Sequence, residues 1–306
     1  MSDSSDDTSA SHPHRPEPVA APDQHSASDQ AASVEPAADA DTDFASSAES
    51  RGARDANRFE PARWLLQIRL AAAFLTILPV APARTESAAD VAASFGWFPL
   101  VGFILGLALC ALDWILKPLF GDAMRAVWIV MILAAITGAL HLDGLADTGD
   151  ALAAGTDRAG VLDILRDSRI GTFGAIALIF VIVLKVFAIA GSVGPQRYAA
   201  IYMAPGLARW AMVAMTSGLD YLRADGAGSA MLARDRRRNL KVATITSVIA
   251  LIPVVMFHAL RASVIAAVVT LVLRSFYRRW LGGVTGDLIG AAGEIVETAV
   301  LIAVTS

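Results

Sequence analysis

Seven apolar runs, each about 20 residues long, follow one another along this chain from residue 95 onwards. A helix needs about 20 apolar residues to cross a membrane, and inside lipid only helices and closed barrels satisfy their own backbone groups. The composition agrees, because 55% of the residues are hydrophobic and only 18% are charged. The sequence therefore predicts an all-α, polytopic membrane bundle of about seven spanning helices. The runs cover residues 95–117, 124–141, 173–194, 197–217, 242–260, 261–280 and 287–305.

A shorter apolar segment, residues 64–80, is harder to assign because it contains Arg69 and stops at Pro79. Orientation helps, since cytoplasmic loops of membrane proteins are enriched in Lys and Arg. Residues 218–241 carry five arginines and one lysine, so we expect that loop in the cytoplasm. Counting spans back from it leaves both ends of 64–80 on the cytoplasmic side, which predicts a re-entrant or interfacial segment. The same count places residues 142–172 in the cytoplasm and the carboxyl terminus on the opposite side.

The first part of the chain has a different character from the rest. Residues 1–60 hold 13 acidic and 4 basic residues, whereas residues 61–306 hold 16 acidic and 21 basic residues. The first part consists largely of Ala, Ser, Asp and Pro and cannot bury enough apolar surface to fold. We therefore expect a disordered acidic tail over residues 1–58, without a cleavable signal peptide, and an integral membrane domain over 59–306. A single cysteine, Cys110, excludes an internal disulfide and a cysteine zinc cluster.

Three aspartates follow the second apolar run, in the segment HLDGLADTGD. Asp143, Asp147 and Asp150 stand at i, i+4 and i+7, which puts their carboxylates on one face of a helix. Adjacent carboxylates repel unless a cation neutralises them, and Mg²⁺ prefers oxygen ligands and usually also contacts substrate phosphates. The segment therefore predicts a magnesium and phosphate site at the cytoplasmic edge of the membrane. A merely solvated acidic loop is the alternative, and His141 is either catalytic or only a helix-end residue.

A second polar segment, RDSRIGTFG, is expected on the same side of the membrane. Asp167 stands here between Arg166 and Arg169, and Gly171 and Gly174 open the next span. Arginine offers planar donors to phosphate, and a helix N-terminus offers free N–H groups. The segment therefore predicts phosphate binding, although both arginines also fit the alternative of simple positive-inside anchors.

Charged residues also fall within the predicted spans. Asp287 opens the last span in GGVTGD, and Glu294 and Glu297 follow it on one helical face, roughly 10–15 Å deeper at about 1.5 Å per residue. Lys185 and Arg209 stand in the middle of their own spans. Charges in lipid are costly and usually face a polar cavity, so we expect a cavity open to the cytoplasm, with carboxylates at its mouth and mixed charge below. The alternative is that both glutamates form structural ion pairs with these cations.

Several of these segments together resemble the cobalamin synthase family of adenosylcobinamide-GDP ribazoletransferases. The resemblance covers about residues 64–305, in family order. One departure is Gly149-Asp150-Ala151, where the family pattern has Ala-Asp-Gly; the third aspartate is kept. The family implies a bacterial inner-membrane, multi-pass enzyme whose active site faces the cytoplasm. The resemblance rests on FLTILPVAP near 74–82, HLDGLADTGDAL, RDSRIGTFGAIAL, the mid-membrane Lys185 and GGVTGDLIGAAGEIVE.

The resemblance implies a Mg²⁺-dependent phosphotransferase of cobalamin (vitamin B12) biosynthesis. The adenosylcobinamide phosphate moiety of adenosylcobinamide-GDP would pass to α-ribazole or its 5′-phosphate, giving adenosylcobalamin or its phosphate and GMP. Such a transfer depends mainly on positioning and charge neutralisation. Besides these substrates, the expected partners are membrane lipid and either further copies of the chain or late cobalamin-pathway enzymes; no nucleic acid is expected.

Each candidate residue receives an expected role on this basis. The catalytic residues are His141, Asp143 and Asp147. The metal ligands are Asp143, Asp147, Asp150, Asp167, Asp287, Glu294 and Glu297. The phosphate-binding residues are Arg166, Arg169, Arg209 and Lys185.

Two other functions compete with this interpretation. CDP-alcohol phosphotransferases also use an Asp-rich helix end, but their pattern has Ala-Arg where this chain has Ala146-Asp147. A transporter would fit midplane charges and discontinuous helices, but it should show two matching halves, and the sequence has no visible internal repeat. Release of GMP from adenosylcobinamide-GDP would separate all three functions.

Overall fold

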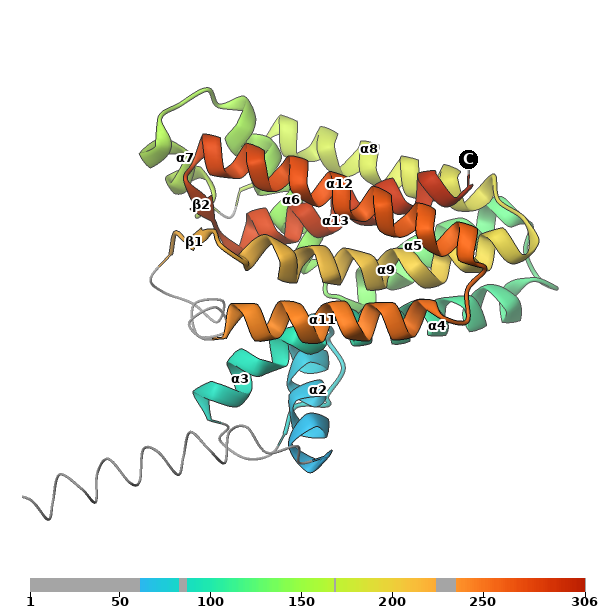
Figure 1. The fold of residues 1–306 in the computed structure, drawn as a ribbon. Coiled ribbons are helices and arrows are strands. Elements are labelled where there is room, and N and C mark those ends of the chain that lie inside the picture. The colour runs from blue at the N-terminus through green and yellow to red at the C-terminus, as the bar shows by residue number, and fades with distance from the viewer. Residues whose placement is uncertain (1–60, 83–86, 168, 224–234, 306) are drawn as a thin grey trace, which may run out of the picture. The chain divides into compact units, whose positions relative to one another are not determined.

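Helices form almost all of the structure, a computed structural model that describes residues 61–82, 87–167, 169–223 and 235–305 (Figure 1). All of these residues belong to one unit that begins at Glu60. The all-α class is confirmed for the described residues, apart from one pair of two-residue strands. The predicted tail, residues 1–58, lies outside the described residues, and its boundary stays a prediction.

The elements follow the apolar runs along the chain. The helices are α2 (Pro61–Leu75), α3 (Ala88–Ser94), the 3-10 turn η1 (Phe95–Trp97), α4 (Phe98–Leu116), α5 (Asp122–Ile136), α6 (Leu140–Ala153), α7 (Arg158–Ile164), α8 (Thr172–Ala190), α9 (Gly194–Thr216), α11 (Arg236–Leu251), α12 (Met256–Trp280) and α13 (Gly286–Thr305). The strands β1 (Asp220–Tyr221) and β2 (Gly283–Val284) pair in parallel.

Four helical stretches are long and apolar enough to cross a membrane: Ala88–Leu116, α8, α12 and α13. The pair α5 and α6 passes the same test only when taken together, and a bend of 91° separates its two helices. The described residues therefore contain four or five candidate spans. The expected number of about seven stays a prediction, because α9 carries Pro205 and two arginines and α11 opens with three arginines.

Two predicted boundaries differ from the helices in the structure. The predicted division between the spans 242–260 and 261–280 falls inside α12, and the real break is at residues 252–255. Pro253 explains it, since proline lacks an N–H group and disfavours helix in the residue before it. The predicted span 124–141 also breaks early, because Gly138 and Ala139 adopt left-handed backbone conformations with φ of 60° and 54°. His141 consequently belongs to α6.

Helices α9 and α13 form the core of the bundle. Helices α4, α11 and α12 pack on α9, and α6, α8 and α12 pack on α13. Gly102 and Gly106 of α4 face the backbone of α9, where added Cβ atoms would lie 2.8 Å from the Cα of Gly206 and 2.9 Å from that of Tyr202. Small residues four positions apart let two helix backbones approach closely. This packing buries most of α9, including Arg209.

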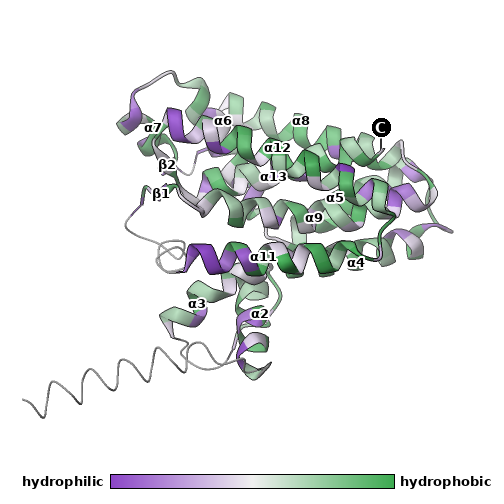
Figure 2. Cartoon of the chain, viewed as in Figure 1, coloured by the Kyte–Doolittle hydropathy of each residue, from purple (hydrophilic) through white to green (hydrophobic). Residues whose placement is uncertain are grey.

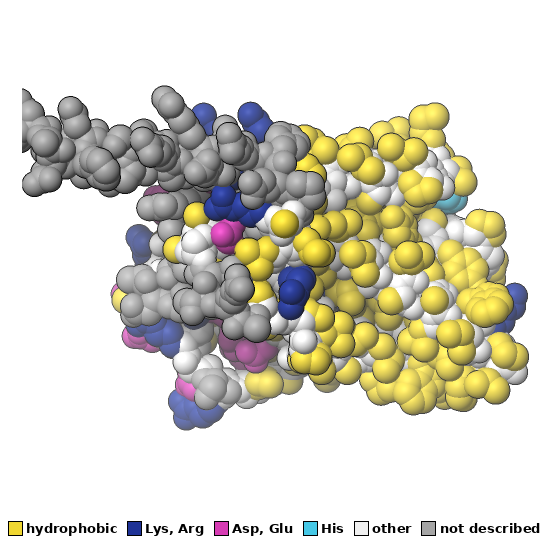
Figure 3. Space-filling model, turned by 90° about the horizontal axis from the view of Figure 1, so that it is seen from below, with side chains coloured by type: hydrophobic (Ala, Val, Ile, Leu, Met, Phe, Trp, Pro, Cys, Tyr) yellow, Lys and Arg dark blue, Asp and Glu magenta, His cyan; other side chains and the backbone are white. Residues whose placement is uncertain are grey.

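Large apolar side chains remain exposed around the bundle, among them Phe180 and Phe187 of α8 and Leu271 of α12. Figure 2 shows helices that are mainly hydrophobic along their middle, with hydrophilic residues concentrated toward their ends. Figure 3 shows one face of the molecule covered mostly by hydrophobic side chains, with the charged ones gathered mainly at one end. An apolar belt of this extent suits contact with lipid acyl chains.

The segment that we expect to be re-entrant or interfacial begins with α2. This helix has 15 residues, is not among the candidate spans, and runs across the direction of the long helices (Figure 1). After α2, the backbone N–H of Ile77 donates a hydrogen bond to the carbonyl of Ile136 at 2.8 Å. Arg69 of α2 also donates to the carbonyls of Val80 and Ala81. The turn therefore contacts the end of α5, and the depth of α2 in the membrane stays a prediction.

Candidate active site

Most of the predicted site residues gather at one end of the bundle, which we call the polar end and define as residues 143–171, 217–223 and 281–287. Helix α6 runs into this end, α8 and α13 begin at it, and the β1–β2 pair belongs to it. Three polar segments that are far apart in the sequence are therefore neighbours in the structure.

The aspartates of α6 lie on one continuous helix, as their spacing predicts. Two glycines bring this helix against α13. A Cβ at Gly144 would lie 2.7 Å from the carbonyl oxygen of Asp287, and one at Gly290 would lie 3.3 Å from the Cα of His141. The two helices thus run in opposite directions in close contact, and α6 extends from the buried His141 toward Asp150 at the polar end.

Asp150 caps the start of α8 from a neighbouring helix. The N-cap residue of α8 is Gly171, which has no side chain to accept hydrogen bonds from the first N–H groups. Oδ2 of Asp150 accepts a hydrogen bond from the N–H of Gly171 at 2.6 Å, and Oδ1 accepts one from Gly174 at 2.8 Å. A Cβ on either glycine would overlap this carboxylate. The N–H groups expected to bind substrate phosphate are therefore engaged by Asp150, whose charge suits the positive end of the helix.

Arg223 is a residue of this end that the sequence analysis used only for orientation. Its NH2 group lies 2.6 Å from Oδ2 of Asp287, and it also donates to the carbonyl of Leu165 at 2.5 Å. The side chain reaches Asp287 because β1 and β2 bring the two loops together. No local sequence pattern predicts this contact, since it depends on the pairing of two distant segments.

Asp147 lies among like charges. It lies within electrostatic range of Asp143 and Asp287, which carry the same charge, and of Arg223, which carries the opposite charge. In the described ranges, no three His, Cys, Asp or Glu side chains are placed to hold a metal ion by themselves. Mg²⁺ usually needs only one or two carboxylates, because it keeps several waters and contacts substrate phosphates. Carboxylates from two facing helices, only partly compensated by one arginine, fit that mode of binding.

The charged residues of the RDSRIGTFG segment form local pairs on the surface. NH2 of Arg169 lies 2.6 Å from Oδ2 of Asp167, and Arg166 lies 3.7 Å from Asp163. The side chain of Arg169 is 87% exposed and that of Arg166 is 63% exposed. The hydrogen bonds from Arg169 hold the pKa of Asp167 below its ordinary value. Both arginines thus lie at the polar end, each beside a neighbouring aspartate.

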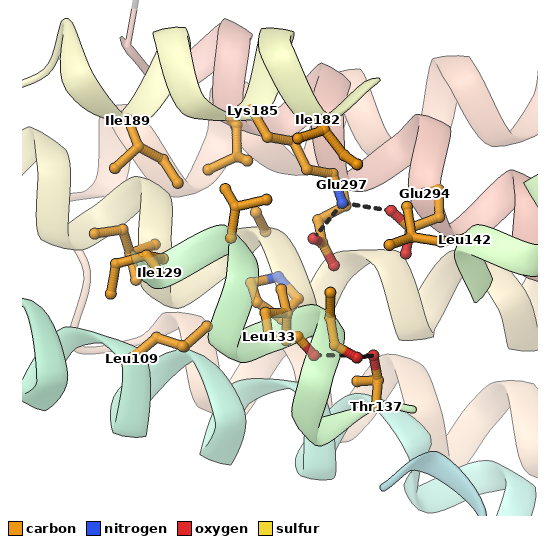
Figure 4. Close-up of a pocket in the computed structure, with 16 residues that line it drawn as sticks. Leu109, Ile129, Leu133, Thr137, Leu142, Ile182, Lys185, Ile189, Glu294 and Glu297 are labelled. Carbon is orange, nitrogen blue, oxygen red and sulfur yellow. Dashed lines mark hydrogen bonds and ion pairs between the residues drawn. The ribbon is translucent and has the colours of Figure 1, made fainter. Parts of the chain in front are cut away.

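The deeper charges form a buried ionic cluster, which we call the buried quartet: Lys185, Arg209, Glu294 and Glu297. Nζ of Lys185 lies 2.5 Å from Oε2 of Glu294 and 2.7 Å from Oε1 of Glu297 (Figure 4). NH1 of Arg209 lies 2.5 Å from Oε2 of Glu297. The structural ion pairs considered as an alternative are therefore present. Two cations and two carboxylates balance one another here without a metal ion or a phosphate.

A small cavity of about 30 Å³ lies beside the quartet, between α5, α8, α9 and α13 (Figure 4). One or two water molecules would fit, since a water needs about 10–15 Å³ of such volume. Most of the side chains that line this cavity are apolar, and the predicted polar cavity open to the cytoplasm stays a prediction. His141 is buried and interacts electrostatically with three members of the quartet, and its Nε2 has no hydrogen-bond partner among the described residues. His141 thus lies near the quartet, on the helix that carries the three aspartates.

A second buried ionic cluster, which the sequence analysis missed, lies near the far end of α8. Asp113 of α4 pairs with Arg125 of α5 and with Arg197 of α9, whose NH2 group lies 2.7 Å from Oδ1 of Asp113. Arg197 also donates to the carbonyl of Ile189 at 2.5 Å. At about 1.5 Å per residue, Ile189 lies roughly 25 Å along α8 from its start. A charged residue inside the apolar run 95–117 was the signal that could have revealed this cluster.

Comparison with known proteins gives matches over most of the chain. The sequence model of the cobalamin-5-phosphate synthase family matches residues 67–305. Proteins named adenosylcobinamide-GDP ribazoletransferase are 37% identical over 236 residues in Syntrophobacter fumaroxidans, 33% over 229 residues in Geotalea daltonii and 33% over 236 residues in a strain of Escherichia coli. These alignments cover 75–76% of this chain and 92–95% of the relatives. No solved structure matches it.

Proposed function

Because the chain belongs to the cobalamin-5-phosphate synthase family, we propose that it is an adenosylcobinamide-GDP ribazoletransferase acting late in cobalamin biosynthesis. It transfers the adenosylcobinamide phosphate moiety of adenosylcobinamide-GDP to α-ribazole or its 5′-phosphate. The products are adenosylcobalamin, or its phosphate, and GMP. The matched residues, 67–305, include every segment of the polar end.

The chemistry of this transfer defines what the site must do. A hydroxyl oxygen of the ribazole attacks the phosphorus atom that is esterified to adenosylcobinamide. A new P–O bond forms while the bond to the bridging oxygen of GMP breaks, so GMP leaves with the electron pair and the hydroxyl proton passes to a base. Such transfers depend mainly on positioning and on neutralising phosphate charge.

The observation that carries the proposal is the meeting of α6 and α13 at the polar end. It brings Asp147 and Asp287 together, with Arg223 on the same carboxylate cluster. This combination of carboxylates and a guanidinium can hold a metal ion and a phosphate side by side.

We assign Mg²⁺ binding to Asp147 and Asp287, which lie on the two helices in contact at the polar end, together with substrate phosphates and water. When bound, Mg²⁺ neutralises charge on the pyrophosphate. Asp143 is exposed one turn before Asp147 on α6, and it accepts the hydroxyl proton in this scheme. Asp150 holds the start of α8, and His141 positions α6 from its buried end.

The other candidate residues take different roles in this proposal. The four side chains of the buried quartet hold α8, α9 and α13 in register through their ion pairs. Each charged residue of the RDSRIGTFG segment contacts a neighbour of opposite charge on the surface. Phosphate binding by Arg166 and Arg169 and metal binding by Asp167 therefore stay predictions.

We further propose that the protein lies in the bacterial inner membrane with the polar end in the cytoplasm. The support is the arginine-rich start of α11, which the positive-inside rule places there. With α9 and α11 as additional spans, the bundle would have seven, and its exposed apolar side chains would contact lipid.

The full-length protein in lipid nanodiscs, supplied with adenosylcobinamide-GDP and α-ribazole, tests the function by chromatographic detection of GMP. We expect release with Mg²⁺ and none after chelation. Asp147→Asn should lower the rate by about 100-fold, as for other groups that stabilise charge at a reacting centre. Asp235→Asn, a change at an exposed aspartate before α11, is the matched control and should leave the rate unchanged. Absence of GMP with the unaltered protein would overturn the function, and full activity in chelator would overturn the metal assignment.

A further inference from the structure

Arg223 occupies a fixed position at the polar end. It follows β1, whose pairing with β2 is extended by a hydrogen bond from the N–H of Leu222 to the carbonyl of Val284 at 2.9 Å. Gly283 of β2 makes room for this arrangement, because a Cβ there would lie 2.5 Å from the side chain of Leu222. β2 leads directly into α13, so the pairing sets Arg223 beside Asp287.

The guanidinium of Arg223 is held through its NH2 group, and not all of its N–H donors are used. Its NH2 group contacts Asp287 at 2.6 Å and the carbonyl of Leu165 at 2.5 Å. Its Nε is buried and has no hydrogen-bond partner in the part of the chain that the structure describes. A guanidinium carries five N–H donors, and a buried donor without an acceptor is costly. The side chain as a whole is 22% exposed, so an incoming anion can reach the guanidinium without displacing Asp287.

The other cations considered for phosphate binding have different surroundings. Arg166 and Arg169 are mostly exposed and lie beside Asp163 and Asp167, respectively. Lys185 and Arg209 are buried in the quartet, where two glutamates balance their charge. Arg223 differs from all four, because its charge acts on Asp147 and Asp287 at the same time.

We propose that Arg223 binds the pyrophosphate of the substrate, with Asp287 holding its guanidinium in place beside Asp147. This inference rests on the proposed function and names the phosphate-binding side chain of that site. A planar guanidinium can contact two phosphate oxygens at once, which an ammonium group cannot reproduce. Arg223 and Asp287 would then lie on the two segments that β1 and β2 join, with Asp147 on the adjoining helix α6.

Binding of inorganic pyrophosphate to the full-length protein in nanodiscs tests this directly, by calorimetric titration with and without Mg²⁺. Loss of hydrogen bonds between charged groups should weaken the affinity of Arg223→Gln by about 10- to 100-fold, and that of Arg223→Lys by less. Arg238→Gln, at an exposed arginine in the first turn of α11, is the matched control and should bind as the unaltered protein does.

Kinetics and thermal unfolding distinguish binding from a structural role. We expect Arg223→Gln to raise the KM for adenosylcobinamide-GDP and to leave the KM for α-ribazole near its original value, with little change in Tm. Unchanged pyrophosphate affinity in Arg223→Gln would overturn this inference alone. Arg223→Lys, which keeps the charge beside Asp287, decides the matter if Arg223→Gln does not fold. Absence of transfer by the unaltered protein would instead overturn the proposed function.

Discussion

At the scale of single residues, the aspartates of α6 divide into two kinds. Asp143 is exposed and Asp147 lies among like charges, whereas both carboxylate oxygens of Asp150 accept hydrogen bonds from the first turn of α8. Helix caps contribute about 0.5–2 kcal/mol to stability. Asp150 therefore stabilises the fold whether or not a metal is bound, and this separates it from the other two.

Asp150→Ala should lower the free energy of unfolding by about 0.5–2 kcal/mol, because the first N–H groups of α8 lose both acceptors. The loss should be the same with Mg²⁺ and with chelator, and it should be smaller in Asp150→Asn, whose amide oxygen can still accept one hydrogen bond. Unfolding in increasing sodium dodecyl sulfate measures it. Asp143→Ala, at an exposed position, is the control and should unfold like the original protein. A stability loss seen only with Mg²⁺ would contradict the capping role.

The spacing of residues in the sequence predicts which carboxylates share a helix face, but not which distant residues they contact. The spacing of Asp143, Asp147 and Asp150 predicts a carboxylate face, because helical periodicity is local. The partner of Asp150 is on α8 and that of Arg223 is on α13, so both contacts depend on how distant segments pack. Periodicity also leaves open whether a buried glutamate meets a cation or a ligand, since that depends on the rotation of neighbouring helices.

At the scale of elements, the contact between α6 and α13 positions the carboxylates. Gly144→Ala should weaken transfer and lower stability by about 1–3 kcal/mol, because its Cβ would meet backbone atoms of Asp287, which cannot swing away. GMP release and detergent unfolding measure the two effects. Gly121→Ala is the control, because among the described residues no atom beyond the adjacent residues lies within 4 Å of the added Cβ. Full activity in Gly144→Ala would mean that close contact between these helices is dispensable.

The buried quartet links α8, α9 and α13 by charge. Lys185→Met leaves two glutamates facing one arginine, and an unpaired buried charge should cost about 3–5 kcal/mol. Glu294→Gln leaves two cations facing one glutamate and should lower the free energy of unfolding by a similar amount. The double variant keeps the pair between Arg209 and Glu297, so it should be more stable than either single variant. Additive losses in detergent unfolding of the three variants would show that these ion pairs do not interact.

The ends of the elements show which sequence signals are strong. Apolar runs predict where α8 and α13 lie, because each run is flanked by polar residues and glycines. Two long apolar segments without a polar gap are harder to divide, and there Pro253 marks the break better than hydropathy does. The sharp turn between α5 and α6 depends on two left-handed residues, of which only Gly138 is a type that favours that conformation.

At the scale of the whole molecule, a charged region lies near each end of α8, in addition to the buried quartet. The polar end contains the aspartates of α6, and the cluster around Asp113 lies near the other end of the same helix. Composition and apolar runs predict such a membrane bundle, because lipid leaves few alternatives for the backbone. They do not fix the number of spans, since α9 combines a proline and two arginines with a buried position that hydropathy alone cannot detect.

This arrangement predicts which surfaces face which side of the membrane. With the polar end in the cytoplasm, a cysteine at Arg158 should react with a membrane-impermeant maleimide only after the cells are permeabilised. A cysteine at Lys117, an exposed residue at the opposite end near Asp113, should react in intact spheroplasts. Both changes are made in a Cys110→Ala background, which removes the single native thiol. Labelling of Arg158→Cys from outside would place the α6 carboxylates away from the cytoplasm, where nucleotide-activated substrates are made.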